Sequence, residues 1–233
     1  QGYDVVLAAL AEGTIATGLD VAAKENRGGI RAGSKRWIDS IATSAMLGEC
    51  LYELGRYTEA VAAFDEALLL SAEHDDWLLS VRFSSQPLKA MPRRIDTPWA
   101  QSNRNVPAGQ FPSTATIRQG TADTKEVLEK GGVLAAPVDY PIRPQEIIKS
   151  TVLALYRRHS ILGDLSDVGP VLENVKRGLA ARPAPPNHYS QSWIDIALGT
   201  ANWAQGRVDQ AVPILKRGLV AENQFDHPLT CWG

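Results

Sequence analysis

The sequence predicts an all-α protein in which antiparallel helix pairs stack into an αα superhelix, interrupted by an irregular and partly β insertion. Apolar residues recur at helical spacing towards both ends of the chain. Glycines separate consecutive helical stretches, as short turns require. Eight of the fourteen prolines fall in one central stretch, and because proline disrupts helices, we expect that stretch to be the insertion.

The N-terminal stretch is expected to be helical, either as one long helix or as two short helices broken near Gly13. Asp4 stands where a signal peptide would carry a basic residue, and no apolar run is long enough to span a membrane. The chain opens on Gln1 without methionine, so we expect a processed product or a piece of a longer protein. The apolar positions of this stretch are Val5, Val6, Leu7, Leu10, Ile15, Leu19 and Val21.

Residues 41–74 carry the clearest helix pair. Gly55 breaks the helical pattern, and apolar residues recur at helical spacing on either side of it. Small residues at 48, 60 and 67 allow two antiparallel helices to approach closely, and Phe64 fills the gap between them. The positions that carry this pattern are Leu47, Gly48, Leu51, Leu54, Gly55, Tyr57, Ala60, Phe64 and Ala67.

This pattern resembles the tetratricopeptide repeat, a unit of about 34 residues with Leu-Gly, an aromatic residue, alanine, phenylalanine and alanine at these offsets. Ser44 stands where the family favours tryptophan, and Ala72 stands where it favours proline. The resemblance implies a right-handed superhelix, in which each helix pair covers the apolar surface of its neighbour. It also implies a binding scaffold, since the family binds many unrelated ligands.

Two further copies of the pattern follow the insertion. In the copy at 190–223, Gly206 takes the place of the turn glycine, and in a looser copy at 145–181 Gly163 does. The strings at 170–179 and 213–219 resemble each other, which indicates duplication. The chain therefore divides into N-terminal repeats at 1–83, an insertion at 84–144 and C-terminal repeats at 145–233, within one continuous superhelical domain. Because His227-Pro228-Leu229 resembles the start of another helix, we expect the natural protein to continue beyond Gly233.

Short strands are expected at 81–83, just before the insertion, and at 114–118 and 133–134 within it, together with a short helical stretch at 124–130. Two interpretations stay open. An irregular segment of this length often carries a function, such as binding or regulation. It can equally serve as a flap that covers the apolar edge of the helical stack.

Composition narrows the class of protein. The formal net charge is −2, and a pI near 6.1 gives no support to a nucleic-acid partner. Two cysteines do not make a disulfide framework, so cysteine usage favours a reducing compartment such as the cytoplasm. Cys50 is expected to be a buried free thiol in the first helix of the clearest pair.

The resemblance implies that a ligand lies in the concave groove formed by the first helix of each pair. The ligand-facing offsets fall on Glu49, Tyr52 and Glu53 in the clearest pair, with Ala42 and Ala45. In the C-terminal copy they fall on Trp193, Ile196, Thr200 and Trp203, which share one helix face by spacing. Tryptophans anchor ligands well, and the glutamates suit a basic partner segment. The alternative interpretation is that these side chains pack against a neighbouring repeat or the insertion.

Other candidate sites are weaker. The basic, glycine-rich segment 27–36 is one residue too short for a phosphate-binding loop, and Ser34-Lys35 reverses the required order. It is expected to be a connector with Ser34 as an N-cap, and anion binding at the next helix start stays open. No spacing of histidines or cysteines predicts a metal site, and no cofactor is expected. No motif predicts a catalytic nucleophile.

The favoured function is therefore a non-catalytic scaffold that binds a protein or peptide partner in its groove. A second hypothesis makes the repeats a regulatory or structural arm of a larger protein or enzyme, with the insertion as the docking element. A third makes the chain itself an enzyme, which would require titratable groups to converge in a pocket.

Overall fold

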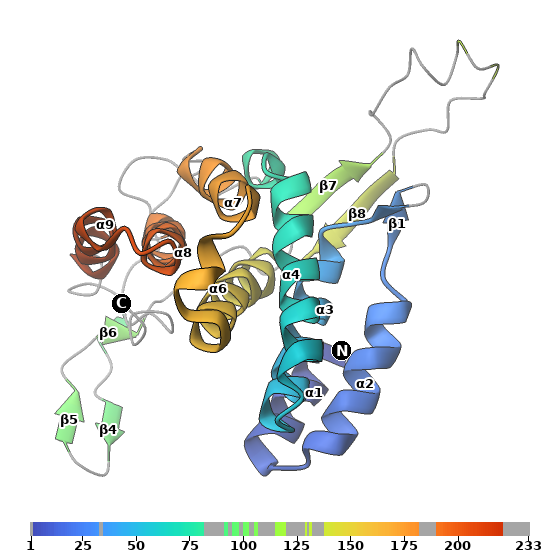
Figure 1. Cartoon of the computed structure of the whole chain (residues 1–233), viewed down its shortest axis with the longest axis horizontal. Helices are drawn as coiled ribbons and strands as arrows, with labels where there is room; N and C mark the ends of the chain where they lie inside the picture. The colour runs from blue at the N-terminus through green and yellow to red at the C-terminus, as the bar shows by residue number, and fades with distance from the viewer. Residues whose placement is uncertain are drawn as a thin grey trace.

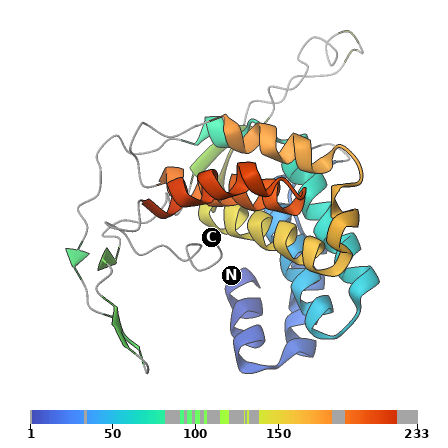
Figure 2. The ribbon, with the colours of Figure 1, turned by 60° about the vertical axis from the view of Figure 1, so that its left-hand side comes forward.

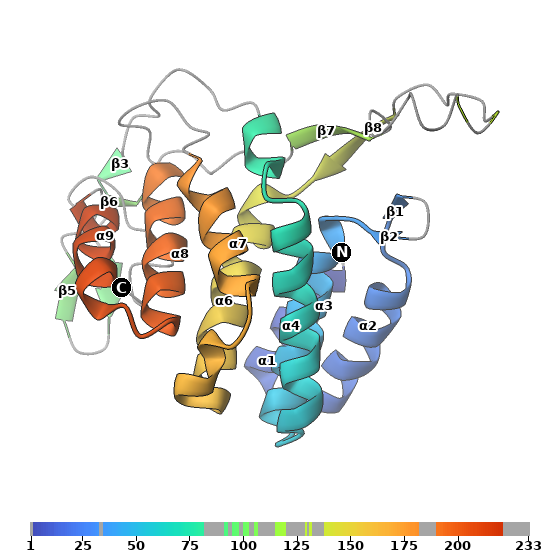
Figure 3. The ribbon, with the colours of Figure 1, turned by 45° about the horizontal axis from the view of Figure 1, so that its top comes forward.

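The computed structural model describes residues 2–32, 35–81, 91–92, 95–97, 100–102, 105–106, 115–119, 129, 131, 138–181 and 190–220. Within these residues, four successive pairs of antiparallel helices lie side by side, which confirms the predicted all-α repeat architecture (Figure 3). The pairs are α1 (Gly2–Glu12) with α2 (Ile15–Arg27), α3 (Asp39–Glu53) with α4 (Tyr57–Glu73), α6 (Pro144–Leu162) with α7 (Val171–Ala180), and α8 (Ser190–Ala204) with α9 (Val208–Val220). Two short 3-10 helices, η1 (Trp77–Ser80) and η2 (Gly163–Asp167), follow α4 and α6.

The first helix of each pair ends at a glycine whose φ is positive. Gly55 has a φ of 72° and Gly206 a φ of 70°, a conformation in which a Cβ atom would be strained. Gly13 and Gly163 occupy the same place after α1 and α6. The N-terminal stretch therefore forms two short helices with a break at Gly13. This is one of the two predicted alternatives.

The pairs stack so that their first helices form one layer. In this layer α1 contacts α3, α3 contacts α6, and α6 contacts α8. In Figure 2 the yellow α6 lies between the blue helices of the first two pairs and the red helices of the last pair. One apolar cluster runs through the second, third and fourth pairs, from Trp37 to Ala204, and a smaller one with Val6, Met46 and Cys50 joins α1 to α3. Each pair therefore buries part of its apolar surface against the neighbouring pairs.

Close packing within a pair depends on a glycine in the first helix. A Cβ atom at Gly48 would lie 2.6 Å from the Phe64 ring of α4, and one at Gly199 would lie 2.6 Å from Leu215 of α9. The corresponding position of α6, seven residues before the turn glycine, is Tyr156. Tyr156 stacks on Trp203 of α8, and α7 packs against α4 and α8 instead of closely against α6.

The described strands form short antiparallel pairs. β7 (Ala115–Gln119) pairs with β8 (Val138–Ile142) beside the helical stack (Figure 1), which confirms the strand predicted at 114–118. Val81, in contrast, lies in a bend after η1 and not in a strand. The other predicted segments, 133–134 and nearly all of 124–130, lie outside the described residues. The remaining pairs are β1 (Arg31–Ala32) with β2 (Lys35–Arg36), β3 (Met91–Pro92) with β6 (Asn105–Val106), and β4 (Ile95–Thr97) with β5 (Ala100–Ser102).

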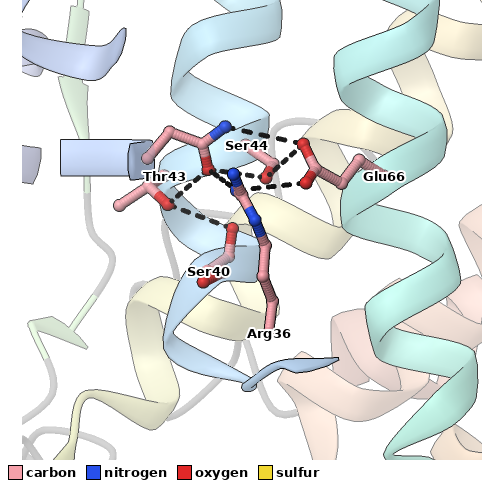
Figure 4. Close-up of polar contacts among 6 residues, drawn as sticks. Arg36, Ser40, Thr43, Ser44 and Glu66 are labelled. Carbon is pink, nitrogen blue, oxygen red and sulfur yellow. Dashed lines mark hydrogen bonds and ion pairs between the residues drawn. The ribbon is translucent and has the colours of Figure 1, made fainter. Parts of the chain in front are cut away.

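A polar network joins the first pair to the second (Figure 4). Its centre is the buried Asn26 of α2, whose Oδ1 accepts hydrogen bonds from Arg36 Nη1 at 2.6 Å and Ser44 Oγ at 3.0 Å. Thr43 Oγ1 donates to the same oxygen at 3.1 Å. Glu66 of α4 closes the network, since its carboxylate accepts from Ser44 at 3.1 Å and pairs with Arg36 at 3.0 Å. Ser44, which stands where the repeat family favours tryptophan, therefore holds a hydrogen-bonding position.

Replacing the central acceptor of this network is expected to destabilise the fold. In Asn26→Ala three donors lose their shared partner, and the free energy of unfolding should fall by about 2–3 kcal/mol. Urea unfolding followed by circular dichroism measures the change. The control is Asn174→Ala on α7, because the Asn174 side chain makes no hydrogen bond within the described residues. Equal effects of the two substitutions would contradict the network's role.

Gly48→Ala tests the close approach of α3 and α4. Alanine normally stabilises a helix by about 1 kcal/mol relative to glycine. Here the added Cβ would press on the Phe64 ring, so we expect a net loss of about 1–3 kcal/mol. The same change should cost less in a Phe64→Leu background, measured as a double-mutant cycle. A stabilising Gly48→Ala would show that the helices are farther apart.

Candidate functional site

Aromatic and charged side chains line up across the C-terminal parts of α3, α6 and α8. We call this set the aromatic row and define it as Tyr52, Tyr156, Arg157, His159 and Trp203. The three helices belong to three consecutive pairs and to the same layer of the stack. A ligand on the row would therefore touch three helix pairs at once.

Arg157 of α6 is the centre of the row. Its Nε donates to Glu49 Oε2 at 2.8 Å, and its Nη2 donates to Glu49 Oε1 at 2.5 Å. The same Nη2 reaches Glu53 Oε1 at 3.3 Å. The guanidinium carbon lies 4.0 Å from the Tyr52 ring centroid, within cation–π range. Arg157 thus ties the third helix pair to the second through a two-pronged ion pair and a ring contact.

The electrostatic setting keeps Arg157 charged. Burial on its own lowers the pKa of the guanidinium, because the charged form loses water. The hydrogen bond with Glu49 and the negative charges of Glu49 and Glu53 outweigh this effect, and the net pKa is raised. The Arg157 side chain is 21% exposed, so the pair is only partly shielded from solvent.

At the other end of the row, Trp203 of α8 stacks on Tyr156, with ring centroids 5.9 Å apart and planes 19° apart. His159 meets Trp203 nearly edge-on, at 4.1 Å between centroids. The Ser166 hydroxyl donates to the carbonyl of Ala204 at 2.5 Å and so accepts from His159 Nδ1 at 2.9 Å. This assignment places the proton of neutral His159 on Nδ1 and fixes the orientation of the ring against Trp203.

The structure brings four of the seven predicted binding residues together in or beside the row: Glu49, Tyr52, Glu53 and Trp203. The other three are buried, with exposed fractions of 3% for Trp193, 0% for Ile196 and 6% for Thr200. A Cβ atom at Gly218 would lie 2.9 Å from Ile196, so this side chain meets α9. Thr200 Oγ1 donates to the Ile196 carbonyl within α8. The helix face on which these residues fall is covered by neighbouring structure.

Arg157, Tyr156 and His159 are not among the predicted binding residues. A signal for Arg157 was present, because it lies six residues before Gly163, as Glu49 lies six before Gly55 and Thr200 six before Gly206. The ligand-facing offset applied to the middle repeat therefore selects Arg157. For Tyr156 no such signal exists, since the family has glycine at this offset.

Other features of the described residues offer less. Within them, no group of three or more histidine, cysteine or acidic side chains is placed to hold a metal ion. No helix in the described ranges is long and apolar enough to cross a membrane. A cavity between α4, α6 and α7 measures about 20 Å³, which is room for about one water molecule. The aromatic row is therefore the candidate binding site.

Comparison with known proteins supports the repeat architecture. No curated protein and no solved structure matches the chain. The family model of the tetratricopeptide repeat matches residues 44–74, which span most of α3 and the whole of α4. This segment carries Glu49, Tyr52 and Glu53. The match confirms the resemblance that was drawn from Leu47-Gly48 and the spacing of the residues that follow. Residues 44–74 thus match the tetratricopeptide repeat, within a chain of stacked helix pairs.

Proposed function

We propose that the chain is a non-catalytic scaffold that binds an extended segment of a protein partner along the aromatic row. The tetratricopeptide repeat is generally a protein-interaction module, and this supports the class of function. The observation that carries the proposal is the row itself, where aromatic side chains of three helix pairs adjoin a fixed arginine.

The shelf made by Tyr156 and Trp203 would hold an apolar or aromatic side chain of the partner. Tyr156 is 41% exposed, so a side chain of the partner can reach its ring. Trp203 is half-buried and braced by His159, so it can bind without first becoming ordered. Aromatic residues held in this way commonly dominate binding energy at interfaces.

Arg157 would add hydrogen bonds to the backbone of the same segment. Its Nε and Nη2 are engaged by the glutamates, whereas its Nη1 makes no hydrogen bond within the described residues. While Arg157 keeps this place, a peptide carbonyl of the partner can accept from Nη1. A basic partner segment can reach the Glu49 carboxylate only by displacing Arg157, which already occupies it.

Trp203→Ala tests the proposal. Peptide ligands are selected from a random displayed library against the intact chain, and their Kd values are measured by fluorescence anisotropy. Loss of the shelf should cost about 2 kcal/mol, which is roughly a 30-fold rise in Kd. The matched control is Leu69→Ala, an exposed apolar side chain of α4 outside the row, which should leave Kd unchanged.

Trp193→Ala separates binding from stability. Because Trp193 is buried, its truncation should lower the free energy of unfolding by about 3–5 kcal/mol. Peptide affinity at a temperature where the variant stays folded should change far less than in Trp203→Ala. The proposal fails if Trp203→Ala and Leu69→Ala bind the selected peptides equally well.

A further inference from the structure

The contacts of Arg157 describe a site as well as a tie between helices. Glu49, Tyr52 and Glu53 all come from α3, at positions separated by three and four residues, so one helix face presents them together. They surround a guanidinium group that comes from another helix, 108 residues along the chain from Glu49. We call Glu49, Tyr52 and Glu53 the arginine cage.

From this geometry we infer that the arginine cage is a binding site for a guanidinium group, and that an arginine side chain of the partner enters it by displacing Arg157. In the free chain Arg157 occupies the cage from within the molecule. The cage thereby defines the chemistry of one partner residue, which the aromatic shelf alone does not.

The shape of the cage selects arginine over lysine. Glu49 accepts from both Nε and Nη2, a parallel pair of bonds that only the planar guanidinium fork can make. The guanidinium carbon lies over the Tyr52 ring, 4.0 Å from its centroid, and the ring is itself supported by Tyr57 at 5.5 Å between centroids. A lysine ammonium would keep the charge attraction and lose the second hydrogen bond with Glu49.

Exchange is feasible because the cage is open on one side. The Glu53 side chain is 42% exposed, and it holds Arg157 only through the longer 3.3 Å contact. When displaced, Arg157 can turn towards Tyr156, whose ring centroid lies 6.0 Å from its guanidinium carbon. An incoming arginine would restore the contacts with Glu49 and Tyr52. The exchange therefore replaces one guanidinium group with another and keeps the same contacts. The cage holds two carboxylates and only one resident cation. This excess of negative charge also favours a cationic ligand.

The neighbouring Arg158 shows what a closed arginine site looks like. Its Nε donates to Asp65 at 2.5 Å, its Nη1 donates to the carbonyl of Ser166, and the residue is buried. The Arg158 side chain is 10% exposed, against 21% for Arg157, although its partner Asp65 is 38% exposed. Arg158 is therefore a matched internal control for Arg157.

That the entering arginine belongs to a partner protein rests on the proposed function. The arginine cage and the aromatic shelf are nevertheless tested by different experiments, so one can fail without the other. The shelf is tested by Trp203→Ala with selected peptides. The cage is tested by ethylguanidinium ion, which carries no group for the shelf.

The first experiment uses Arg157→Met, which keeps much of the aliphatic stem and removes the resident guanidinium. Ethylguanidinium chloride at millimolar concentration should raise the Tm of this variant by about 2–4 °C and saturate. Ethylammonium chloride at the same concentration should give a clearly smaller rise, and Glu49→Gln/Arg157→Met should not respond to ethylguanidinium. Equal effects of the two cations, or a rise that survives Glu49→Gln, would overturn the cage.

The second experiment uses the unaltered chain and does not depend on the variant folding. The Nε–H signals of Arg157 and Arg158 are followed by NMR during titration with ethylguanidinium at constant ionic strength. Displacement should speed hydrogen exchange at Arg157 Nε several-fold and leave Arg158 Nε unchanged. Unchanged exchange at both, or a parallel increase at both, would overturn the inference.

Discussion

The structure depends on how closely the two helices of a pair can approach. A glycine seven residues before the turn lets Phe64 press onto α3 and Leu215 press onto α8. In α6 a tyrosine takes this place, and α7 moves away to pack against α4 and α8. The same substitution leaves Tyr156 at the surface, where it stacks on Trp203. The aromatic shelf thus lies where the third pair departs from the close packing of the second and fourth pairs.

Repetition explains how the rest of the site comes together. Equivalent positions of successive first helices become neighbours in space, because the helices lie side by side in one layer. Glu49 and Arg157 stand at the same offset from their turn glycines, and they meet as an ion pair of opposite charges. A repeat with one residue type at this offset would place like charges together. Divergence between the copies therefore creates both the tie between pairs and the cage.

The helix pairs can be predicted from the sequence, because turn glycines and the helical spacing of apolar residues are local signals. The sequence predicts the break at Gly55 and the face that Glu49 and Tyr52 share, since both follow from the geometry of one helix. It does not predict which neighbour covers a face. Trp193 and Ile196 lie at ligand-facing offsets and are buried all the same, because the packing of surrounding structure decides their exposure. The partnership of Arg157 with Glu49 spans 108 residues, and the sequence signals it only through the equal offset of the two residues from their turn glycines.

The network around Asn26 has a consequence for how repeats can be recombined. Apolar interfaces between repeats tolerate exchange, because methyl groups and rings accept many neighbours of similar volume. Asn26, Arg36, Ser44 and Glu66 instead form directional bonds across the junction of the first two pairs. A repeat transplanted from elsewhere would leave the hydroxyl of Ser44 and the carboxylate of Glu66 without hydrogen-bond partners on the neighbouring pair. The junction therefore accepts one particular neighbour, and modularity in this protein stops at the boundary between its first and second helix pairs.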